Sequence, residues 1–327
     1  MKQIDIFSHF MPPRYKEALY KQTGRRFQML EIPTLFTLEE RFRTMDKFGD
    51  YRQVITPIGP VPESVANPQE AAELCRIANE GTAEAVAKHP DRFVGGVAIL
   101  PMNNMDAALK EADRAIKDLK LKGIIIHTPI NGQPMDMPQF MPLYEKLAQH
   151  DLPIWIHPRR EQTPDYTNEH TSKYWIWCVF GWPYETTLAM TRLAFSGVFD
   201  RFPNIKFITH HCGAFVPYMS GRIEYVYQLA GSFGKQFDYQ MKEPIIEYFR
   251  KFYNDTAIHG STSGLMCAQD FFGVDRILFG ADVPFDTKGG ELSLKDTIQS
   301  IERMAISQAD KEKIFYKNAQ KMLHLSP

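Results

Sequence analysis

The chain has 327 residues, 44% of them hydrophobic, so it can bury a large core either as one big barrel or as two ordinary domains. Its 38 lysines and arginines balance 39 aspartates and glutamates, which favours neither nucleic acid nor an anionic membrane surface as a partner. No segment approaches the roughly 20 apolar residues that cross a membrane, and the N-terminus lacks the layout of a signal peptide. We therefore expect a cytoplasmic protein whose partner is a small molecule.

Short runs rich in β-branched residues alternate with helical periodicity along the whole chain. Eight such runs occur, at residues 3–7, 53–57, 93–100, 122–128, 152–158, 204–211, 251–257 and 276–285. The clearest helical patterns between them cover residues 66–89, 104–120 and 185–202. Runs such as GIIIH are apolar throughout, which indicates parallel strands buried on both faces. The pattern predicts an α/β fold, a (β/α)8 barrel that takes in residues 1–327 as a single domain.

Two connections are longer than a barrel requires, at about residues 11–36 and 158–182. Long ordered loops often act as lids or binding elements, whereas others are variable surface excursions. The second connection follows His157 directly and contains Trp175 and Trp182, which are too apolar to be left in solvent. We expect this second connection to cover a binding site.

Polar residues gather where the predicted strands end, which is the edge that carries the active site in barrels of this type. They are His9, His127, His157, His210, His211 and Asp282. One such histidine alone would more readily be a hydrogen-bonded core residue. Several at one face, together with a carboxylate, predict a site for zinc or another divalent transition metal.

The chain resembles the amidohydrolase superfamily, in the branch that contains the 2-amino-3-carboxymuconate-6-semialdehyde, γ-resorcylate and 5-carboxyvanillate decarboxylases. The resemblance covers almost the whole chain and implies a distorted (β/α)8 barrel. The stretches that carry it, in order, are IDIFSHFMP, RFRTMD, HPDRFVGGVAILP, WIHP, GWPYETTLAM, SGVFDRFPNIKFITHHCGAFVPYMSGRI and DRILFGADVPF.

This resemblance implies a metal centre and a catalytic histidine. His9, His157 and Asp282 match metal ligands, and Asp282 is also a candidate proton carrier. His211 matches the catalytic histidine beside the metal. Because His210 precedes it on a strand, the side chain of His210 is expected to point to the opposite side.

The resemblance also implies substrate contacts. Arg222 matches an arginine that reaches into a neighbouring subunit to bind a substrate carboxylate, which implies a homodimer or a dimer of dimers; the alternative is a salt bridge on a surface helix. Arg41 matches a second carboxylate-binding arginine, although the nearby Arg43 leaves that choice open. Trp182 would help to close the site over an apolar ring. Glu185 would orient the catalytic histidine, unless it only caps its helix.

One position departs from the family pattern. Aligned on Asp5, the related proteins carry histidine or glutamate where this chain has Phe7, which cannot coordinate a metal. Three protein ligands with water or substrate remain an ordinary arrangement for catalytic zinc. His127 could add a nitrogen, bind substrate or be an ordinary buried histidine. Phe7 could pack against an aromatic substrate or belong to the core beneath the site, and a metal-free site is the alternative.

The function expected from these features is non-oxidative decarboxylation of a small aromatic or unsaturated carboxylic acid. A divalent metal, zinc first and manganese second, would hold the carboxylate while a proton delivered to carbon creates an electron sink. Hydrolysis of a lactone, amide or ester and hydration of an unsaturated acid would use the same residues. A weakened or metal-free barrel that only binds an aromatic acid is a further alternative.

Overall fold

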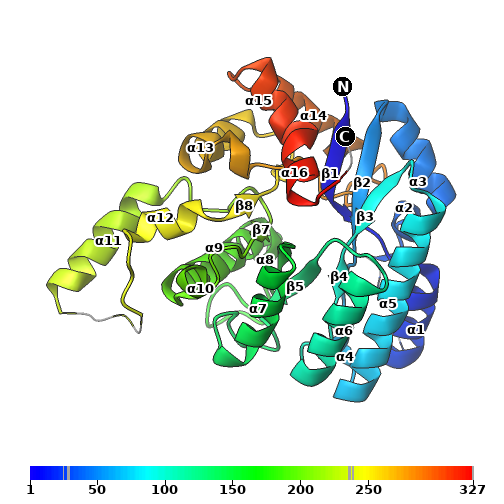
Figure 1. The fold of residues 1–327 in the computed structure, drawn as a ribbon, viewed down its shortest axis with the longest axis horizontal. Coiled ribbons are helices and arrows are strands. Elements are labelled where there is room, and N and C mark those ends of the chain that lie inside the picture. The colour runs from blue at the N-terminus through cyan, green and yellow to red at the C-terminus, as the bar shows by residue number, and fades with distance from the viewer. Residues whose placement is uncertain (25, 28–29, 235–236, 238, 326–327) are drawn as a thin grey trace.

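The computed structural model describes residues 1–24, 26–27, 30–234, 237 and 239–325 (Figure 1). All paired strands run parallel, in one sheet of order β1-β2-β3 and a second of order β4-β5-β6-β7-β8. The strands are β1 (Gln3–His9), β2 (Tyr51–Thr56), β3 (Phe93–Gly96), β4 (Ala98–Ile99), β5 (Ile124–Thr128), β6 (Ile154–Pro158), β7 (Phe207–Thr209) and β8 (Tyr253–Asn254).

The run predicted as one strand at 93–100 divides into β3 and β4 because the chain changes partners there. Val97 still donates its N–H to Ile55 of β2 at 3.0 Å, whereas the next residue, Ala98, donates to Gly123 before β5 at 2.9 Å. The two sheets are therefore successive parts of one curved wall.

The eighth predicted strand, at 276–285, is irregular, and it closes the wall between β8 and β1. It forms only isolated bridges, Asn254 with Ile277 and Ser8 with Val283. The hydroxyl of Thr256 bonds both N–H and C=O of Gly280 at 3.0 Å, in place of a ladder of backbone bonds. The fold is thus the expected barrel, distorted at this segment. Backbone hydrogen bonds of 2.8 to 2.9 Å join this closing segment to β1 and β8. They run from Ile6 to Phe279, from His9 to Val283 and from Leu278 to Asn254.

Helices follow the strands and cover the outside of the wall (Figure 1). Helix α5 agrees with its prediction because Asn67 and Glu70 form a capping box around a proline at the first helical position. The helices are α1 (Pro13–Thr23), α2 (Pro33–Phe36), α3 (Leu38–Met45), α4 (Pro62–Val65), α5 (Pro68–Lys88), α6 (Met105–Lys117), α7 (Met141–Gln149), α8 (Ile176–Val179), α9 (Gly181–Phe195), α10 (Val198–Arg201), α11 (Ser220–Ser232), α12 (Ile245–Arg250), α13 (Thr262–Phe272), α14 (Glu291–Glu302), α15 (Gln308–Glu312) and α16 (Asn318–Met322).

The helix predicted over 185–202 starts earlier and breaks in two. Helix α9 begins at Gly181, so Glu185 lies in its second turn rather than at its start. Gly197 has a left-handed φ of 75°, which ends α9 and begins the short helix α10. In the first long connection, α1 and α2 lie on either side of residues 25, 28 and 29, which are outside the described residues.

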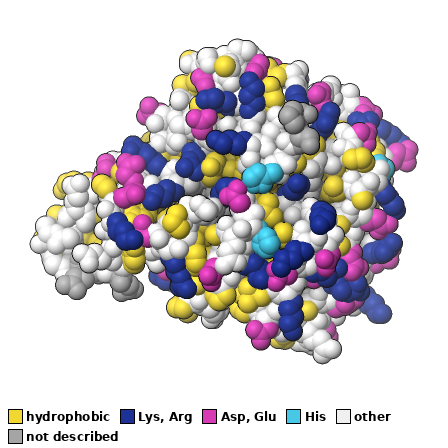
Figure 2. All heavy atoms as spheres, viewed as in Figure 1, with side chains coloured by type: hydrophobic (Ala, Val, Ile, Leu, Met, Phe, Trp, Pro, Cys, Tyr) yellow, Lys and Arg dark blue, Asp and Glu magenta, His cyan; other side chains and the backbone are white. Residues whose placement is uncertain are grey.

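Helix α11 projects from the barrel (Figure 1). None of its residues is buried. On the face that Figure 2 shows, basic and acidic side chains are interspersed. Among the described residues, the structure contains no helix long and apolar enough to cross a membrane.

The floor of the barrel is built around Trp155 of β6. Its side chain is fully buried, and its indole Nε1 donates to the carbonyl oxygen of Ile6 in β1 at 2.9 Å. Because β1 and β6 are not neighbours in the sheets, this bond crosses the barrel interior. Trp155 shares one apolar cluster with Ile6, Phe7 and Leu278, which supports the strand ends above it.

We predict that Trp155→Ala lowers the free energy of unfolding by about 3–5 kcal/mol, because it leaves a cavity and an unbonded carbonyl. Urea denaturation at fixed pH measures this loss. The matched control is Trp175→Ala, since Trp175 is 59% exposed, and its change should stay within about 0.5 kcal/mol. Equal effects of the two substitutions would contradict the assignment of Trp155 to the barrel floor.

Candidate active site

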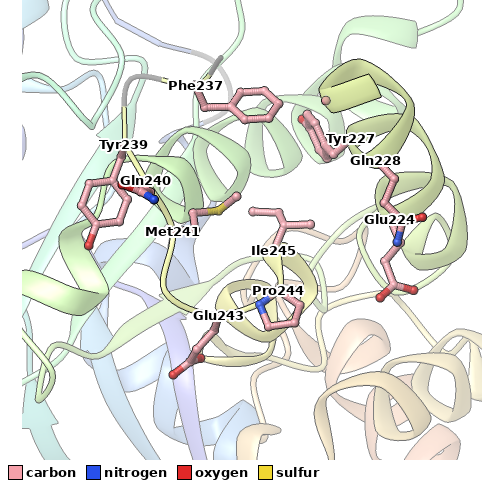
Figure 3. A pocket seen from close by; sticks show the side chains of 11 residues that line it. Glu224, Tyr227, Gln228, Phe237, Tyr239, Gln240, Met241, Glu243, Pro244 and Ile245 are labelled. Carbon is pink, nitrogen blue, oxygen red and sulfur yellow. The ribbon is translucent and has the colours of Figure 1, made fainter. Parts of the chain in front are cut away.

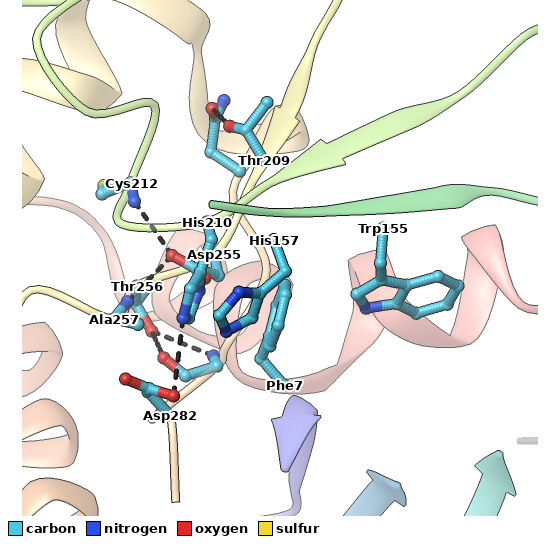
Figure 4. A network of polar contacts seen from close by, with 12 residues as sticks. Phe7, Trp155, His157, Thr209, His210, Cys212, Asp255, Thr256, Ala257 and Asp282 are labelled. Atoms are coloured by element: carbon cyan, nitrogen blue, oxygen red, sulfur yellow. Dashed lines mark hydrogen bonds and ion pairs between the residues drawn. The ribbon is translucent and has the colours of Figure 1, made fainter. Parts of the chain in front are cut away.

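The ends of β1 and β6, the two residues after β7 and the closing segment bring five polar side chains together. Nitrogens of His9, His157 and His210 lie within 4.8 Å of one another, and so do the ligand atoms of His210, His211 and Asp282. Oδ1 of Asp282 is 3.1 Å from Nε2 of His9 and 3.4 Å from Nε2 of His210. Figure 4 shows His157, His210 and Asp282 converging on one point.

The imidazoles of His9, His157 and His210 are oriented through Nδ1. Nδ1 of His9 lies 3.2 Å from the hydroxyl oxygen of Thr56, and Nδ1 of His157 donates to the carbonyl of Pro158 at 2.7 Å. Nδ1 of His210 bonds a carboxylate oxygen of Asp255. The Nε2 atoms therefore face the middle of the cluster. Nε2 of His9 and Nε2 of His210 are buried without a hydrogen-bond partner.

The electrostatics of the cluster suit a cation. Burial raises the pKa of Asp282, but His210 and His9 outweigh burial and hold this pKa well below its usual value. Burial lowers the pKa of His9 and of His157, so both rings are neutral. Burial lowers the pKa of His210, but Asp255 and Asp282 outweigh burial and raise it to about 10, so this ring carries a proton. The carboxylate of Asp282 and the neutral rings of His9 and His157 are donors that divalent transition metals prefer, so these three residues fit such a metal.

His210 shows the largest difference from the sequence-based expectation, because its ring faces the cluster instead of the opposite side. The predicted strand runs to residue 211, but β7 ends at Thr209. His211 and Cys212 then have left-handed φ values of 59° and 56°. The alternation of side chains along a strand therefore ends before the two histidines, and their rings lie 4.0 Å apart. Burial lowers the pKa of His211, whose Nδ1 has no hydrogen-bond partner.

A cavity of about 530 Å³ opens beside the cluster and is largely apolar. Trp182 forms part of its wall, with ring centroids 6.0 Å from His157 and 6.4 Å from His211. The second long connection thus does contribute to a cavity at the strand ends. The lining residues are Ile32, His157, Trp175, Cys178, Val179, Trp182, Pro183, His211, His259, Asp282, Phe285, Asp286 and Thr287.

Sequence reasoning missed two residues of this region. His259 lines the cavity, with Nε2 4.0 Å from Oδ2 of Asp282, and Asp255 anchors His210. Asp255 lies near the end of the strand predicted at 251–257, and a polar residue at a strand end is the pattern that identified the other candidates. His259 lies two residues beyond that strand, so the same pattern indicates it more weakly.

Phe7 and His127 belong to the surroundings of the cluster, and neither is among the residues that line the cavity. The Phe7 side chain is fully buried and stacks on His210 at 4.0 Å with an angle of 16° between the rings. This position supports the expectation that Phe7 belongs to the core beneath the site rather than packing against a substrate. The ring centroids of His127 and His157 lie 4.9 Å apart, and Nε2 of His127 is buried without a hydrogen-bond partner. Burial, followed by neighbouring charges, lowers its pKa to about 3, so its ring is neutral.

Arg41 is buried against the end of β1. It donates to the carbonyl oxygen of His9 at 2.8 Å, to that of Thr34 at 3.0 Å and to the side chain of Gln53. Burial lowers its pKa to about 10, which still leaves it charged at neutral pH. The neighbouring Arg43 instead pairs with glutamates on the surface. Arg41 thus holds the chain that carries His9, and its role in substrate binding stays a prediction.

The two other predicted residues, Glu185 and Arg222, are not among the residues that line the cavity. Glu185 accepts a bond from the hydroxyl of Thr128 at 3.1 Å, so it is tied to the end of β5. Arg222 is exposed on α11. Within one chain, the structure therefore does not bring Arg222 to the cavity lining.

Comparisons with known proteins agree on one family. A family model described as Amidohydrolase matches residues 5–325. A γ-resorcylate decarboxylase of Polaromonas sp. is 31% identical over 299 residues, which cover 88% of this chain and 87% of that protein. The 2-amino-3-carboxymuconate-6-semialdehyde decarboxylase of Dictyostelium discoideum is 32% identical over 264 residues, covering 80% and 69% of the two chains.

A solved structure extends this likeness to three dimensions. The dihydroxybenzoic acid decarboxylase from Polaromonas sp. JS666, with bound manganese and the inhibitor 2-nitroresorcinol, has a TM-score of 0.82 at 29% identity, covering 99% of this chain and 97% of that one. The chain therefore belongs to the amidohydrolase family, and the distorted (β/α)8 barrel is confirmed. The expected enzyme class, a carboxy-lyase of this superfamily, is confirmed with it.

We predict that Arg41→Ala lowers the free energy of unfolding by roughly 2–5 kcal/mol, because it leaves the buried carbonyls of His9 and Thr34 without a donor. Arg43→Ala is the matched control and should change stability by less than about 1 kcal/mol. Chemical denaturation measures both. Unchanged stability of Arg41→Ala, together with a raised KM for substrate, would assign Arg41 to substrate binding instead.

Proposed function

We propose that this enzyme is a metal-dependent, non-oxidative decarboxylase of a small aromatic acid with a hydroxyl group beside its carboxylate. The observation that carries the proposal is a cluster in which His210 lies within 4.8 Å of both His9 and His157 and of Asp282, with His157 and Asp282 lining an apolar cavity. The relatives that share the family and fold are decarboxylases, including one of a dihydroxybenzoic acid. These facts favour lyase chemistry over the hydrolase and hydratase alternatives, which would use the same residues.

His9, His157 and Asp282 would hold the metal, with manganese as the first candidate because the Polaromonas relative binds it. Zinc, which the donor types also suit, is the second candidate. When bound, a divalent metal supplies a positive charge that orients the substrate carboxylate and its neighbouring oxygen and stabilises negative charge on them.

The cavity suits an aromatic acid in size and lining. Its volume of about 530 Å³ is in the range of small-molecule sites, and Trp182 and Phe285 offer flat apolar surface to a ring. No arginine or lysine occurs among the described residues that line it. Within one chain, the negative charge of a substrate is therefore left to the metal and to neighbouring histidines.

Decarboxylation requires a proton on the ring carbon that carries the carboxylate. The carbon–carbon bond then breaks, carbon dioxide leaves, and its bonding electrons return to the ring. The carboxylate of Asp282 lines the cavity and, because its pKa is held low, delivers this proton only after receiving one from water by way of His211. His211 has a ligand nitrogen within 4.8 Å of an Asp282 oxygen and is neutral, so it can receive a proton and pass it on. Trp182 would exclude water from the ring.

We predict that a panel of hydroxybenzoic acids yields a substrate from which the protein releases carbon dioxide. His211→Ala should lower kcat by about 10²–10⁴-fold, because proton transfer loses its partner. The matched control is His170→Ala, an exposed histidine in the second long connection, which does not line the cavity. Carbon dioxide release and product chromatography are the measurements. Opening of lactones without any release of carbon dioxide would contradict the proposed reaction.

We further propose a homodimer, alone or as half of a dimer of dimers, in which Arg222 enters the partner's cavity. Two observations support it: no arginine or lysine is among the described residues that line the cavity, and apolar side chains are exposed on α11 and at its C-cap, among them Tyr225, Leu229 and Phe233. A hollow with both apolar and polar lining lies between α11 and residues 237 and 239–245 (Figure 3). Its lining includes Tyr227, Phe237, Met241 and Ile245.

We predict that Arg222→Ala raises KM by at least about 10-fold and leaves the dimer intact, because a charged hydrogen bond to the substrate is lost. Mixing Arg222→Ala with His211→Ala, with subunit exchange, should restore roughly a quarter of wild-type activity, since mixed dimers contain one complete site. Activity and light scattering are measured together. A monomer in solution, or no recovery in mixed dimers, would remove Arg222 from the site.

A further inference from the structure

A second cavity, of about 660 Å³, shares none of its lining residues with the catalytic cavity. Its wall is formed by α4, the chain after β5, the chain after β6 and α9, which contribute Glu63, Asn131, Arg159, Arg160 and Glu185. This volume is in the range of small-molecule sites. The lining combines two arginines with buried carboxyl groups, whereas no arginine or lysine is among the described residues of the catalytic cavity. The decarboxylation proposed above makes no use of this charged space.

Glu63 is a buried acid in this wall that lacks a partner. It is 8% exposed, and its Oε2 is buried without a hydrogen-bond partner. Burial raises its pKa to about 7, although its own backbone N–H and the charge of Arg159 act to lower it. A buried carboxyl group that served packing alone would be expected to have its oxygens paired. A cation placed beside Glu63 would remove the cost of burying its charge.

The two arginines offer positive charge that the protein leaves largely unpaired. Arg159 reaches Glu161 at 3.6 Å, but the side chain of Glu161 is 78% exposed, so this ion pair contributes little. Arg160 forms no ion pair within the described part of the chain, and its guanidinium lies over the ring of Tyr184 at 5.7 Å. Both guanidinium groups are therefore available to a carboxylate, which arginine binds well through paired hydrogen bonds.

The chain that carries these arginines is fixed in place. The N–H of Arg159 donates to the carbonyl oxygen of Thr128 at 2.7 Å, and the carbonyl oxygen of Arg160 accepts the indole N–H of Trp182 at 3.4 Å. A Cβ on Gly181 would lie 2.6 Å from Cδ of Arg160, so the glycine makes room for this side chain. Because the protein orders this segment before a ligand arrives, binding there costs less conformational entropy.

We propose that this cavity is a second binding site, which takes a small zwitterion of the α-amino acid class. The carboxylate of the ligand binds the guanidinium groups of Arg159 and Arg160, and its ammonium group pairs with Glu63. The mixed lining selects both charges, because an anion alone would leave Glu63 unpaired and a cation alone would be repelled by the arginines. The site is separate from the catalytic cavity, so its occupation does not depend on the proposed decarboxylation.

Isothermal titration calorimetry of the full chain with each standard amino acid tests this site. At least one amino acid should bind with a Kd of about 1 mM or tighter. Glu63→Gln and Arg160→Gln should each weaken that binding by at least about 10-fold, because each removes a charged hydrogen bond. The matched control is Lys173→Gln, which removes an exposed positive charge from the same long connection as Arg160 but does not line the cavity. Its affinity should equal that of wild type.

Two results would overturn the proposal. One is that no amino acid binds at this level. The other is binding that Glu63→Gln and Arg160→Gln leave unchanged, since the ligand would then lie elsewhere on the protein.

Changes in the ligand keep the test decisive if either variant does not fold. The amide of the bound amino acid lacks the carboxylate charge, and its des-amino analogue lacks the ammonium group, so each should bind wild type at least about 10-fold more weakly. Equal affinity of the des-amino analogue would overturn the assignment of Glu63 to the ammonium group. Ser64→Trp, at an exposed lining position, should fill the cavity and abolish binding without changing any charge, and unchanged binding would place the ligand outside this cavity.

Discussion

The buried carboxylate of Asp282 is the charge on which the site depends. An unpaired charge at the mouth of a barrel is costly, and the protonated ring of His210, 3.4 Å away, compensates it here, with Nε2 of His9 at 3.1 Å. To place this carboxylate, the closing segment leaves the regular strand geometry, with a φ of 56° at Asp282 itself. The distortion of the barrel and the assembly of the site are therefore one structural feature.

A second buried carboxylate, that of Asp5 in β1, fixes the other side of the junction between β1 and the closing segment. It accepts the N–H of Phe7 at 2.9 Å, the N–H of Ala281 at 3.3 Å and the hydroxyl of Tyr51 at 2.8 Å. These bonds join β1, β2 and the closing segment just below the cluster. The register of β1 against β2 also shifts between Asp5 and Ser8. Such an irregularity re-aims side chains, and it lies where His9 is directed toward Asp282.

Strand order and the positions of His9, His157 and Asp282 could be predicted from sequence, because a polar residue at the end of an apolar run is a local signal. The direction of His210 could not, because it depends on left-handed backbone at His211, which no local pattern indicates. The anchoring role of Arg41 was equally hidden, since its partners are backbone carbonyls that the fold brings together.

The turn after β7 also explains why the adjacent residues His210 and His211 have different surroundings. In a strand, His210 and His211 would face opposite sides, and only one could reach the centre. The left-handed turn instead presents both rings to the same region, 4.0 Å apart, with Asp255 holding the first and nothing bonded to Nδ1 of the second. The backbone turn therefore gives the two adjacent histidines different surroundings, one ring fixed by a carboxylate and the other with an unbonded nitrogen suited to proton transfer.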